Sequence, residues 1–270
     1  MKLIYIFVAV VAVGIAGFYA LNDYIFTEKQ AETVTETPRA PVVDSLATTN
    51  AEAVVVAPIS HATMVLTFGE VVVYVDPVGG AEAFAGQPPA NIVLVTDIHG
   101  DHLSTSTLEA VMGDTTTLIA PQAVQELLPA SLASRVTVMA NDDTRTEQGL
   151  SITATPMYNV PETADSRHAK GRGNGYLVSV EDTRVYIAGD TGPIPEMMAL
   201  TDIDVAFVPM NLPYTMGVEE ASQAVLAFAP TKVIPYHYRQ PDGFADVEKF
   251  KSLIEAGNKD IEVELLGWYE

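Results

Sequence analysis

The sequence predicts a mixed α and β fold, because short β-branched runs alternate with helical patterns from Val54 to the C-terminus. The chain of 270 residues is 48% hydrophobic and 18% charged, a balance typical of a globular protein. The early part of this region is rich in strands with tight connections, whereas the later part alternates strands with helices. Both antiparallel and parallel strand pairing are therefore expected.

The strand candidates are short apolar runs rich in Val, Ile and Leu. In chain order they occupy residues 54–57, 64–68, 71–75, 91–95, 117–120, 135–139, 151–155, 175–180, 184–188, 204–208, 232–236 and 261–266. Helix candidates lie between them, at residues 104–112, 121–128, 193–200, 219–229 and 246–256.

The N-terminus carries an uncharged apolar run between Lys2 and Asp23, about the length of a helix that crosses a bilayer. Residues 1–22 are therefore predicted to be a membrane anchor, with a cleaved signal segment as the alternative. The bias of charge across the run predicts that the rest of the chain is extracytoplasmic: periplasmic or at the cell surface, or secreted after cleavage. Residues 23–52 are polar and aperiodic and predict a flexible linker, so the folded domain is expected over 53–270.

The charge balance excludes whole classes of partner. Fourteen Lys and Arg against 35 Asp and Glu give a net charge of −21, which argues against nucleic acid as a partner. The absence of cysteine excludes thiolate metal sites and cysteine nucleophiles, so a metal would have to bind nitrogen and oxygen. The oligomeric state is left open.

The densest group of potential ligands follows the strand candidate at 91–95. The segment TDIHGDHLS places Asp97, His99, Asp101 and His102 within six residues of one another. Alternate residues of a loop that leaves a strand project to one side, and Gly100 permits a turn that brings His102 round to join them. One or two metal ions would fit there. The alternative is a solvated acidic turn in front of a helix capped by Ser104.

Other strand ends carry ligand types as well. Asp190 follows the strand candidate at 184–188 between two glycines, His237 follows 232–236, and Asn159 follows 151–155 as a weak oxygen ligand at best. A single Asp or His at a strand end is more often a cap than a ligand, but several at matching positions favour a shared metal site.

A positive cluster in a glycine-rich loop stands out in this acidic chain. Arg167, Lys170 and Arg172 surround His168 and are candidates to bind a carboxylate or phosphate of a substrate. The alternative is a solvated loop whose cations pair with nearby acids. Tyr214 is a candidate donor to a developing oxyanion, against the commoner role of a buried structural tyrosine.

Taken together, these motifs resemble the metallo-β-lactamase superfamily, in particular the ascorbate-6-phosphate lactonase-like branch. The resemblance rests on ISHATMVLTF with VVVYVDP, then TDIHGDHL, VYIAGDTG, DVAFVPMNLPYTM and VIPYHY, in the family's order. It implies an α+β fold, a four-layer αβ/βα sandwich, with an active site at the edge between two sheets and a metal-bound hydroxide as the nucleophile.

The sequence departs from the family pattern at two positions. Asp97 replaces the first histidine of the His-x-His-x-Asp-His signature, and Asn159 stands where a later histidine usually completes the first metal site. The resemblance then implies a better-retained second site of Asp101, His102, His237 and the bridging Asp190, and a first site of Asp97, His99 and Asp190.

Two further histidines have open roles. His168 is the candidate for the missing imidazole, with a solvent-facing or substrate-contacting loop histidine as the alternative. His61 lies in the family's ISH segment and either faces the pocket or is a hydrogen-bonded core residue.

The predicted function is a metal-dependent hydrolase acting on an ester, lactone, amide or phosphoester bond of a small anionic substrate. Asp101 and Asp97 are the candidate catalytic carboxylates that orient the nucleophile and handle its proton. The expected cofactor is Zn²⁺, as one or two ions, with Mn²⁺ or Fe²⁺ as competitors because oxygen donors replace nitrogen at two positions. The alternative is a catalytically impaired metal-binding or ligand-binding protein on the same fold.

Overall fold

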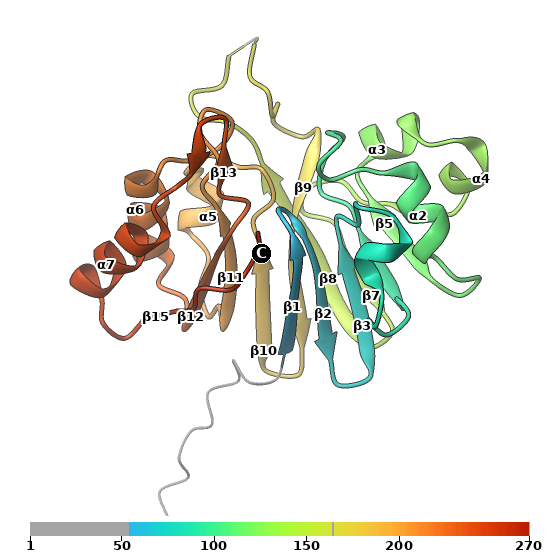
Figure 1. The fold of residues 1–270 in the computed structure, drawn as a ribbon, viewed down its shortest axis with the longest axis horizontal. Helices are drawn as coiled ribbons and strands as arrows, with labels where there is room; N and C mark the ends of the chain where they lie inside the picture. The colour runs from blue at the N-terminus through green and yellow to red at the C-terminus, as the bar shows by residue number, and fades with distance from the viewer. Residues whose placement is uncertain (1–53, 164, 270) are drawn as a thin grey trace, which may run out of the picture. The chain divides into compact units, whose positions relative to one another are not determined.

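The computed structural model describes residues 54–163 and 165–269, which fold into two β-sheets packed face to face with helices on both outer faces (Figure 1). The first sheet has the order β1-β2-β3-β4-β5-β6 and the second the order β15-β12-β11-β10-β9-β8-β7. Each sheet therefore combines an antiparallel part with a parallel part, as the sequence predicts.

The first sheet begins with an antiparallel meander and continues with parallel strands. Its strands are β1 (Val54–Ser60), β2 (Thr63–Phe68), β3 (Val71–Val75), β4 (Ile92–Leu94), β5 (Thr117–Ala120) and β6 (Val136–Val138). All three residues of β4 are buried, which agrees with the continuous apolar run expected of a parallel strand covered on both faces.

The second sheet repeats this plan, with antiparallel pairing from β7 to β10 and parallel pairing from β10 to β15. Its strands are β7 (Thr144–Glu147), β8 (Leu150–Met157), β9 (Gly173–Val180), β10 (Thr183–Ile187), β11 (Val205–Pro209), β12 (Lys232–Tyr236) and β15 (Glu262–Val263). A small separate hairpin is formed by β13 (Arg239–Gln240) and β14 (Gly243–Phe244).

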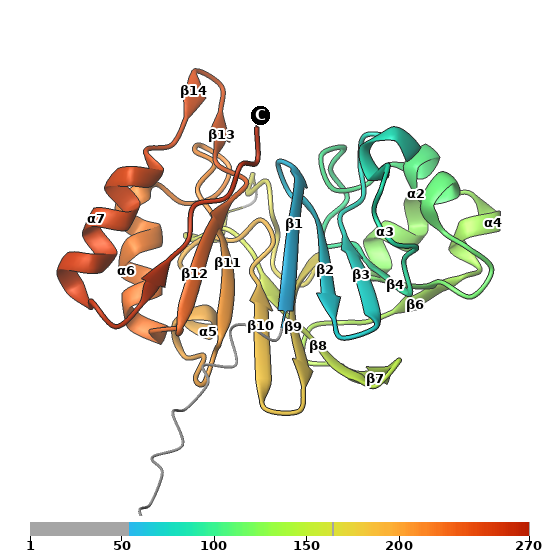
Figure 2. The same ribbon diagram turned by 60° about the horizontal axis from the view of Figure 1, so that its bottom comes forward.

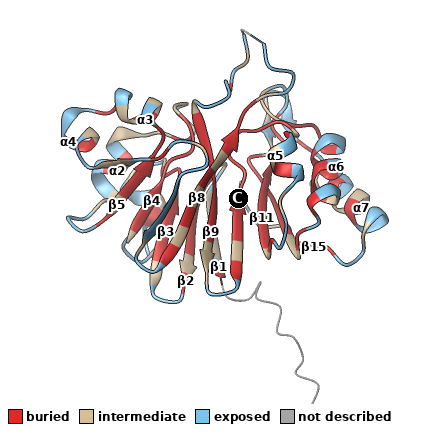
Figure 3. Cartoon of the chain, turned by 180° about the vertical axis from the view of Figure 1, so that it is seen from behind, coloured by how far each residue is buried: buried red, intermediate tan, exposed pale blue. Residues whose placement is uncertain are grey.

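Helices cover the outer face of each sheet. Those on the first sheet are η2 (Ala81–Phe84), α2 (Thr105–Val111), α3 (Gln122–Leu127) and α4 (Ala130–Ala133), and those on the second are α5 (Pro195–Met198), α6 (Val218–Phe228) and α7 (Val247–Gly257). Three apolar clusters result: one between the sheets and one beneath each helical layer. Figure 3 shows this as buried strands and as helices whose outer surfaces are exposed.

The four-layer αβ/βα sandwich that the sequence motifs predict is thus confirmed. Every strand and helix candidate is present, with ends that differ by a few residues. Sequence reasoning missed β7, β13, β14, η2 and α4, which have two to four residues each. Elements that short carry too few residues to show a hydrophobic period.

The predicted membrane association is corrected by the structure. The longest helices in the described residues, α6 and α7, have 11 residues each, about half the roughly 20 that a bilayer span needs. No helix within 54–163 or 165–269 is long and apolar enough to cross a membrane. The anchor or signal segment predicted at 1–22 lies outside the described residues, and the membrane, periplasmic and secreted assignments are withdrawn.

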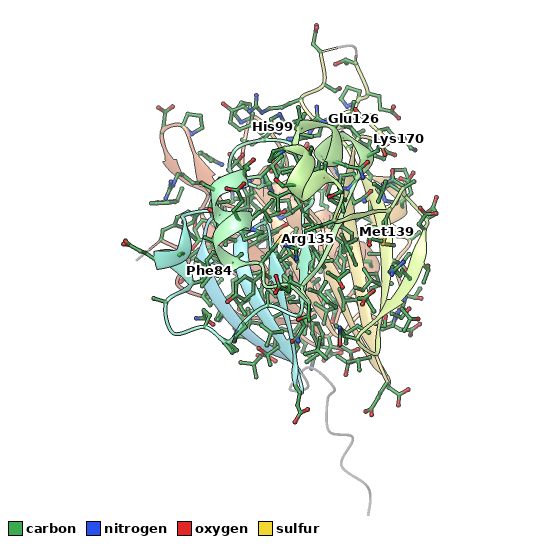
Figure 4. All side chains as sticks on the ribbon, turned by 90° about the vertical axis from the view of Figure 1, so that its right-hand side faces the viewer. Phe84, His99, Glu126, Arg135, Met139 and Lys170 are labelled. Carbon is green, nitrogen blue, oxygen red and sulfur yellow. The ribbon has the colours of Figure 1, made fainter. Side chains whose placement is uncertain are left out.

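The carboxyl ends of β4, β10 and β12 and the turn between β1 and β2 meet at one end of the sandwich. Figure 2 shows the β13–β14 hairpin projecting there beside the C-terminus. In Figure 4, His99 lies at the upper end of the molecule, well above Phe84 and Arg135. The loops of both sheets therefore converge where the sequence places its histidines.

Candidate metal centre

All five histidines of the chain lie in three adjoining groups of potential ligand atoms. One group is His102, Asp190 and His237, a second is Asp97, His99 and His168, and a third is His61, Asp101 and His237. Within each group the nitrogen and oxygen atoms lie within 4.8 Å of one another. Seven candidate ligands singled out from the sequence are thus brought together in space.

The ligand atoms of the first group are spaced as tetrahedral coordination of a metal ion requires. His102 Nε2 lies 3.1 Å from His237 Nε2 and 3.2 Å from Asp190 Oδ2, and His237 Nε2 lies 3.2 Å from Asp190 Oδ1. Ligand atoms of a tetrahedral site with bonds of about 2.0–2.1 Å stand roughly 3.3 Å apart. Asp101 Oδ2, 3.5 Å from His237 Nε2, is placed to join them.

Asp190 connects the first group to the second. Its Oδ2 also lies 3.1 Å from His168 Nε2, while Asp97 Oδ2 contacts His99 Nδ1 and lies 3.8 Å from His168 Nε2. His168 Nε2 and Asp190 Oδ1 are buried, yet neither forms a hydrogen bond of good geometry with the described residues. His168 Nε2 lies in the second group and Asp190 Oδ1 faces His237 of the first, and a metal ion in each group would satisfy such unpaired buried atoms, so the donor set fits a metal.

Contacts on the far side of each ring direct the Nε2 lone pairs toward the centre. His102 Nδ1 lies 2.8 Å from Asp76 Oδ2, and His168 Nδ1 lies 3.1 Å from the Tyr214 carbonyl oxygen. Each Nδ1 thus faces an acceptor and carries the proton, which leaves Nε2 free as a ligand.

His237 has the same arrangement once the orientation of an amide is considered. Its Nδ1 lies 3.0 Å from the Asn211 Nδ2, and the Asn211 Oδ1 is buried without a hydrogen bond to the described residues. A 180° rotation of the Asn211 amide would turn this unpaired oxygen toward Nδ1–H and satisfy both groups.

Asp76 anchors the whole arrangement from beneath. It is fully buried and accepts hydrogen bonds from the Thr96 backbone N–H (2.7 Å) and the Thr96 hydroxyl (2.6 Å) in addition to its contact with His102. Burial raises the pKa of Asp76, and the charge and hydrogen bond of His102 oppose that rise. Asp76 lies in the VVVYVDP motif, and its sequence context alone predicts no role for it.

The carboxyl groups at the centre are held ionised. Burial would raise the pKa of Asp190, but the charges of His237 and His102 outweigh it and hold that pKa well below its usual range. Burial likewise raises the pKa of Asp97, and its hydrogen bond to His99 and the charges of His102, His99 and Arg172 bring the net shift down. Ionised carboxylates are the form that binds a cation.

The local backbone explains how Asp190 reaches the centre. Gly189 adopts a φ of 64°, in the left-handed region that favours glycine, at the point where β10 ends. Sequence reasoning expected a sharp turn at the glycines flanking Asp190, and the structure shows it at Gly189. The Ser104 cap proposed as the alternative for the histidine loop is also present, since its hydroxyl accepts from the Thr107 N–H and starts α2.

A hollow of about 320 Å³ opens over the two groups. It is lined by His61, His99, Asp101, Arg167, Asp190, Asn211, Tyr214, Arg239, Gln240 and Pro241. Among the predicted substrate-binding residues, Arg167, Tyr214 and His61 therefore face this hollow. The Arg167 guanidinium stacks over the Tyr214 ring at 4.9 Å.

The structure places the other predicted substrate-binding residues elsewhere. Arg172 Nη2 binds both carboxylate oxygens of Asp97, at 3.1 and 3.3 Å. Lys170 pairs with Glu196 at 2.8 Å and lies over the Tyr158 ring. Asn159 accepts from the His168 N–H and donates to the Tyr214 carbonyl, so it fixes the loop that carries His168.

Tyr269 and His61 support Asp101 from the side of the C-terminus. The Tyr269 hydroxyl oxygen accepts from the backbone N–H groups of Tyr238 and Arg239, both at 3.1 Å, and lies 2.8 Å from His61 Nδ1. With both lone pairs used, its proton points to His61 Nδ1. His61 then carries its own proton on Nε2, which donates to Asp101 Oδ2 at 3.3 Å.

Substitution of Tyr269 by phenylalanine is expected to destabilise the fold by about 1–3 kcal/mol, because two N–H groups and one imidazole nitrogen lose their partner. Chemical denaturation measures this loss. Nitrogen-15 NMR of the histidine rings should also show that His61 no longer holds a single tautomer. Tyr238→Phe is the control, since the Tyr238 hydroxyl has no hydrogen bond within the described chain, and equal stability of the two variants would contradict the assignment.

The family model for the β-lactamase superfamily domain matches residues 56–237, about two thirds of the chain and all of the candidate ligands. The chain belongs to the metallo-β-lactamase superfamily. A UPF0173 metal-dependent hydrolase from Methanopyrus kandleri is 32% identical over 77% of this chain and 94% of its own length. Another from Methanoregula boonei is 34% identical over 77% of this chain and 93% of its own length.

Solved structures agree with these relatives. The crystal structure of a candidate metal-dependent hydrolase from Parabacteroides distasonis matches this superfamily member with a TM-score of 0.69 and 35% identity, over 78% of this chain and 92% of that one. This superfamily member is therefore a metal-dependent hydrolase, and the enzyme prediction is confirmed. The matches do not resolve the lactonase-like branch that the motifs predict.

Proposed function

We propose that this metal-dependent hydrolase cleaves an ester, lactone, amide or phosphoester bond in a small anionic molecule bound in the hollow over the two ligand groups. The observation that carries the proposal is Asp190, whose two oxygens join the groups beneath that hollow. The lactone belongs to this set because the motifs resemble lactonase-like members of the superfamily.

Two sets of residues would hold the metal, which the proposal takes to be Zn²⁺, as one or two ions. One set is His102, His237, Asp190 and Asp101, and the other is Asp97, His99, His168 and the shared Asp190. His168 thus supplies the imidazole that the family pattern places at Asn159. When bound, the metal supplies the acidity that makes water a nucleophile near neutral pH. Mn²⁺ and Fe²⁺ are competitors, because carboxylate oxygens form much of the donor set.

Asp101 is the proposed carboxylate for proton handling. It is the most exposed carboxylate of the centre, at 40% of its side chain, and it lines the hollow. Burial would raise the pKa of Asp101, but its hydrogen bonds to His237 and His61 hold it far below the usual range, so it enters the reaction ionised. It can orient the attacking water and pass the proton to the leaving group. Asp97, which Arg172 neutralises, is assigned a ligand role.

The substrate would be oriented by Arg167 and Tyr214. Arg167 presents a delocalised cation beside the centre and suits a carboxylate or phosphate. Tyr214 faces the same hollow, where its hydroxyl can donate to an oxygen on which negative charge develops.

Removal of the metal is expected to abolish hydrolysis by the full chain. The test measures metal content by mass spectrometry, then turnover of lactones, phosphodiesters and β-lactams before chelation, after chelation and after the metal is restored. Turnover that survives complete chelation would overturn the proposed chemistry. A metal-loaded protein that is inert on every substrate class would leave the bond assignment wrong.

A further inference from the structure

A second hollow adjoins the one over the metal ligands. It has a volume of about 370 Å³ and lies beside the β1–β2 turn and η2. Its lining comprises Ile59, Ser60, His61, Thr63, Val78, Gly79, Ala83, Asp101 and Arg239. Three of these residues, His61, Asp101 and Arg239, also line the first hollow. The two hollows therefore meet at Asp101 and Arg239 and form one groove. We call the hollow over the metal ligands the metal-side hollow and the one beside η2 the side hollow.

The metal-side hollow carries two arginines that have no carboxylate partner in the described part of the chain. Arg167 stacks over Tyr214 at 4.9 Å, and Arg239 stacks over Tyr269 at 4.7 Å. The chain has only 14 Lys and Arg for 35 acids, so a guanidinium without an ion pair is unexpected on charge balance alone. Each guanidinium group stacks with its flat face on a tyrosine ring, so the N–H donors at its edge remain available to bind an anion.

The side hollow has a different character. Apart from the three shared residues, its lining has no charged side chain, and Ile59, Val78 and Ala83 supply its carbon surface. Ile59 and Ala83 also pack against the apolar cluster beneath α2 and α3, which fixes this surface in place. Each hollow alone is near the small end of the roughly 300–1,000 Å³ that small-molecule sites occupy.

We propose that the substrate is an amphiphilic anion, whose carboxylate or phosphate group is bound between Arg167 and Arg239 and whose apolar portion lies in the side hollow. This inference rests on the proposed hydrolase function and specifies its substrate class. Arg239 was not singled out from the sequence, and in this view it is a specificity-determining residue at the junction of the two hollows. The scissile bond would lie beside Asp101, the carboxylate common to both hollows.

The test measures binding rather than turnover. Inorganic phosphate and hexyl phosphate are titrated by calorimetry into the full-length chain loaded with Zn²⁺. Both ligands present a phosphate group to the metal and the arginines, and only hexyl phosphate adds an alkyl chain, so a higher affinity of hexyl phosphate reports on the side hollow. Each methylene that becomes buried should raise the affinity roughly fourfold. Equal affinities for the two ligands would overturn the proposal.

Variants assign the two parts of the groove. Arg167→Gln and Arg239→Gln should each weaken both ligands about tenfold or more. Ala83→Phe fills the side hollow and should cancel the preference for hexyl phosphate while inorganic phosphate still binds. Ile59→Gln, which adds an amide without filling the hollow, should lower that preference and serves if Ala83→Phe does not fold. Arg145→Gln, an exposed arginine on β7, is the control.

The outcomes separate this inference from the proposed function. The amphiphilic substrate would be contradicted if Ala83→Phe and Ile59→Gln both kept the preference for hexyl phosphate over inorganic phosphate. It would also be contradicted if both arginine variants bound phosphate with unchanged affinity, even if the enzyme hydrolyses a test ester. Loss of all turnover with intact preference for hexyl phosphate would contradict the hydrolytic assignment and leave the binding site in place.

Discussion

Asp190→Asn is expected to lose metal from both ligand groups and to reduce hydrolysis by more than about 100-fold. Substitution of a residue that only orients a metal ligand typically lowers metal affinity or activity by about 10–100-fold. A larger loss is expected here because Asp190 contacts the ligand nitrogens directly. Its Oδ2 lies 3.2 Å from His102 Nε2 and 3.1 Å from His168 Nε2, and its Oδ1 lies 3.2 Å from His237 Nε2. An amide has no charge to offer and presents one oxygen in place of two, so it cannot join the groups.

The measurement is metal per chain by mass spectrometry, together with kcat and KM for whichever substrate the panel identifies. Asp182→Asn is the matched control, because it makes the same chemical change near the same strand. Asp182 is exposed in the turn between β9 and β10. Metal content near wild type in Asp190→Asn, with activity reduced less than tenfold, would show that Asp190 does not bridge the groups.

The placement of Asp190 illustrates what the sequence can predict. Asp190 and His237 each follow a short apolar run, and the parallel strands β10, β11 and β12 bring those carboxyl ends to one edge of the second sheet. Asp97 follows a similar run, β4, in the first sheet. Because the pattern of runs was strong, the strands and their order of appearance followed from the sequence. The face-to-face packing of the two sheets followed only from the resemblance, since periodicity does not specify how sheets stack.

The residues that sequence reasoning missed act through contacts between distant parts of the chain. Asp76 meets His102 across 26 residues, and Tyr269 meets His61 across 208. Neither carries a local pattern that distinguishes a supporting residue from an ordinary strand end or terminus. The loop around His168 shows the same limit, because Arg167 faces the hollow, Arg172 binds Asp97 and Lys170 binds Glu196. Three cationic side chains within six positions point in different directions, and only the folded conformation of the loop determines them.

The apparent affinity for metal is expected to rise with pH above 6.5 by up to tenfold per pH unit for each proton released. Burial alone would lower the pKa of His102, but the carboxylates of Asp190 and Asp76 outweigh it and raise that pKa well above its usual value of about 6.5. In the metal-free protein His102 is then protonated around neutral pH. A metal ion must displace that proton, so binding becomes tighter as pH rises toward the folded pKa.

The same shift fixes how the stability of the metal-free protein depends on pH. A raised pKa in the folded state means that protonated His102 contributes stability that is fully present below about pH 6.5 and is lost as pH rises through the folded pKa. The gain in Tm on adding metal should therefore grow across that window. Thermal denaturation from pH 6 to 9, with and without Zn²⁺, and calorimetry in buffers of different ionisation enthalpy measure both effects.

Asp76→Asn tests the origin of this dependence. Removing one of the two carboxylates should move the window toward pH 6.5, and the loss of the partner on Nδ1 should weaken metal binding at high pH by about 10–100-fold. Asp143→Asn is the control, an exposed carboxylate in the turn before β7 whose Oδ2 accepts only a backbone N–H. A pH window unchanged in Asp76→Asn would mean that Asp76 does not set the protonation of His102. A Tm gain that shrinks as pH rises would contradict protonated His102 as the group that the metal displaces.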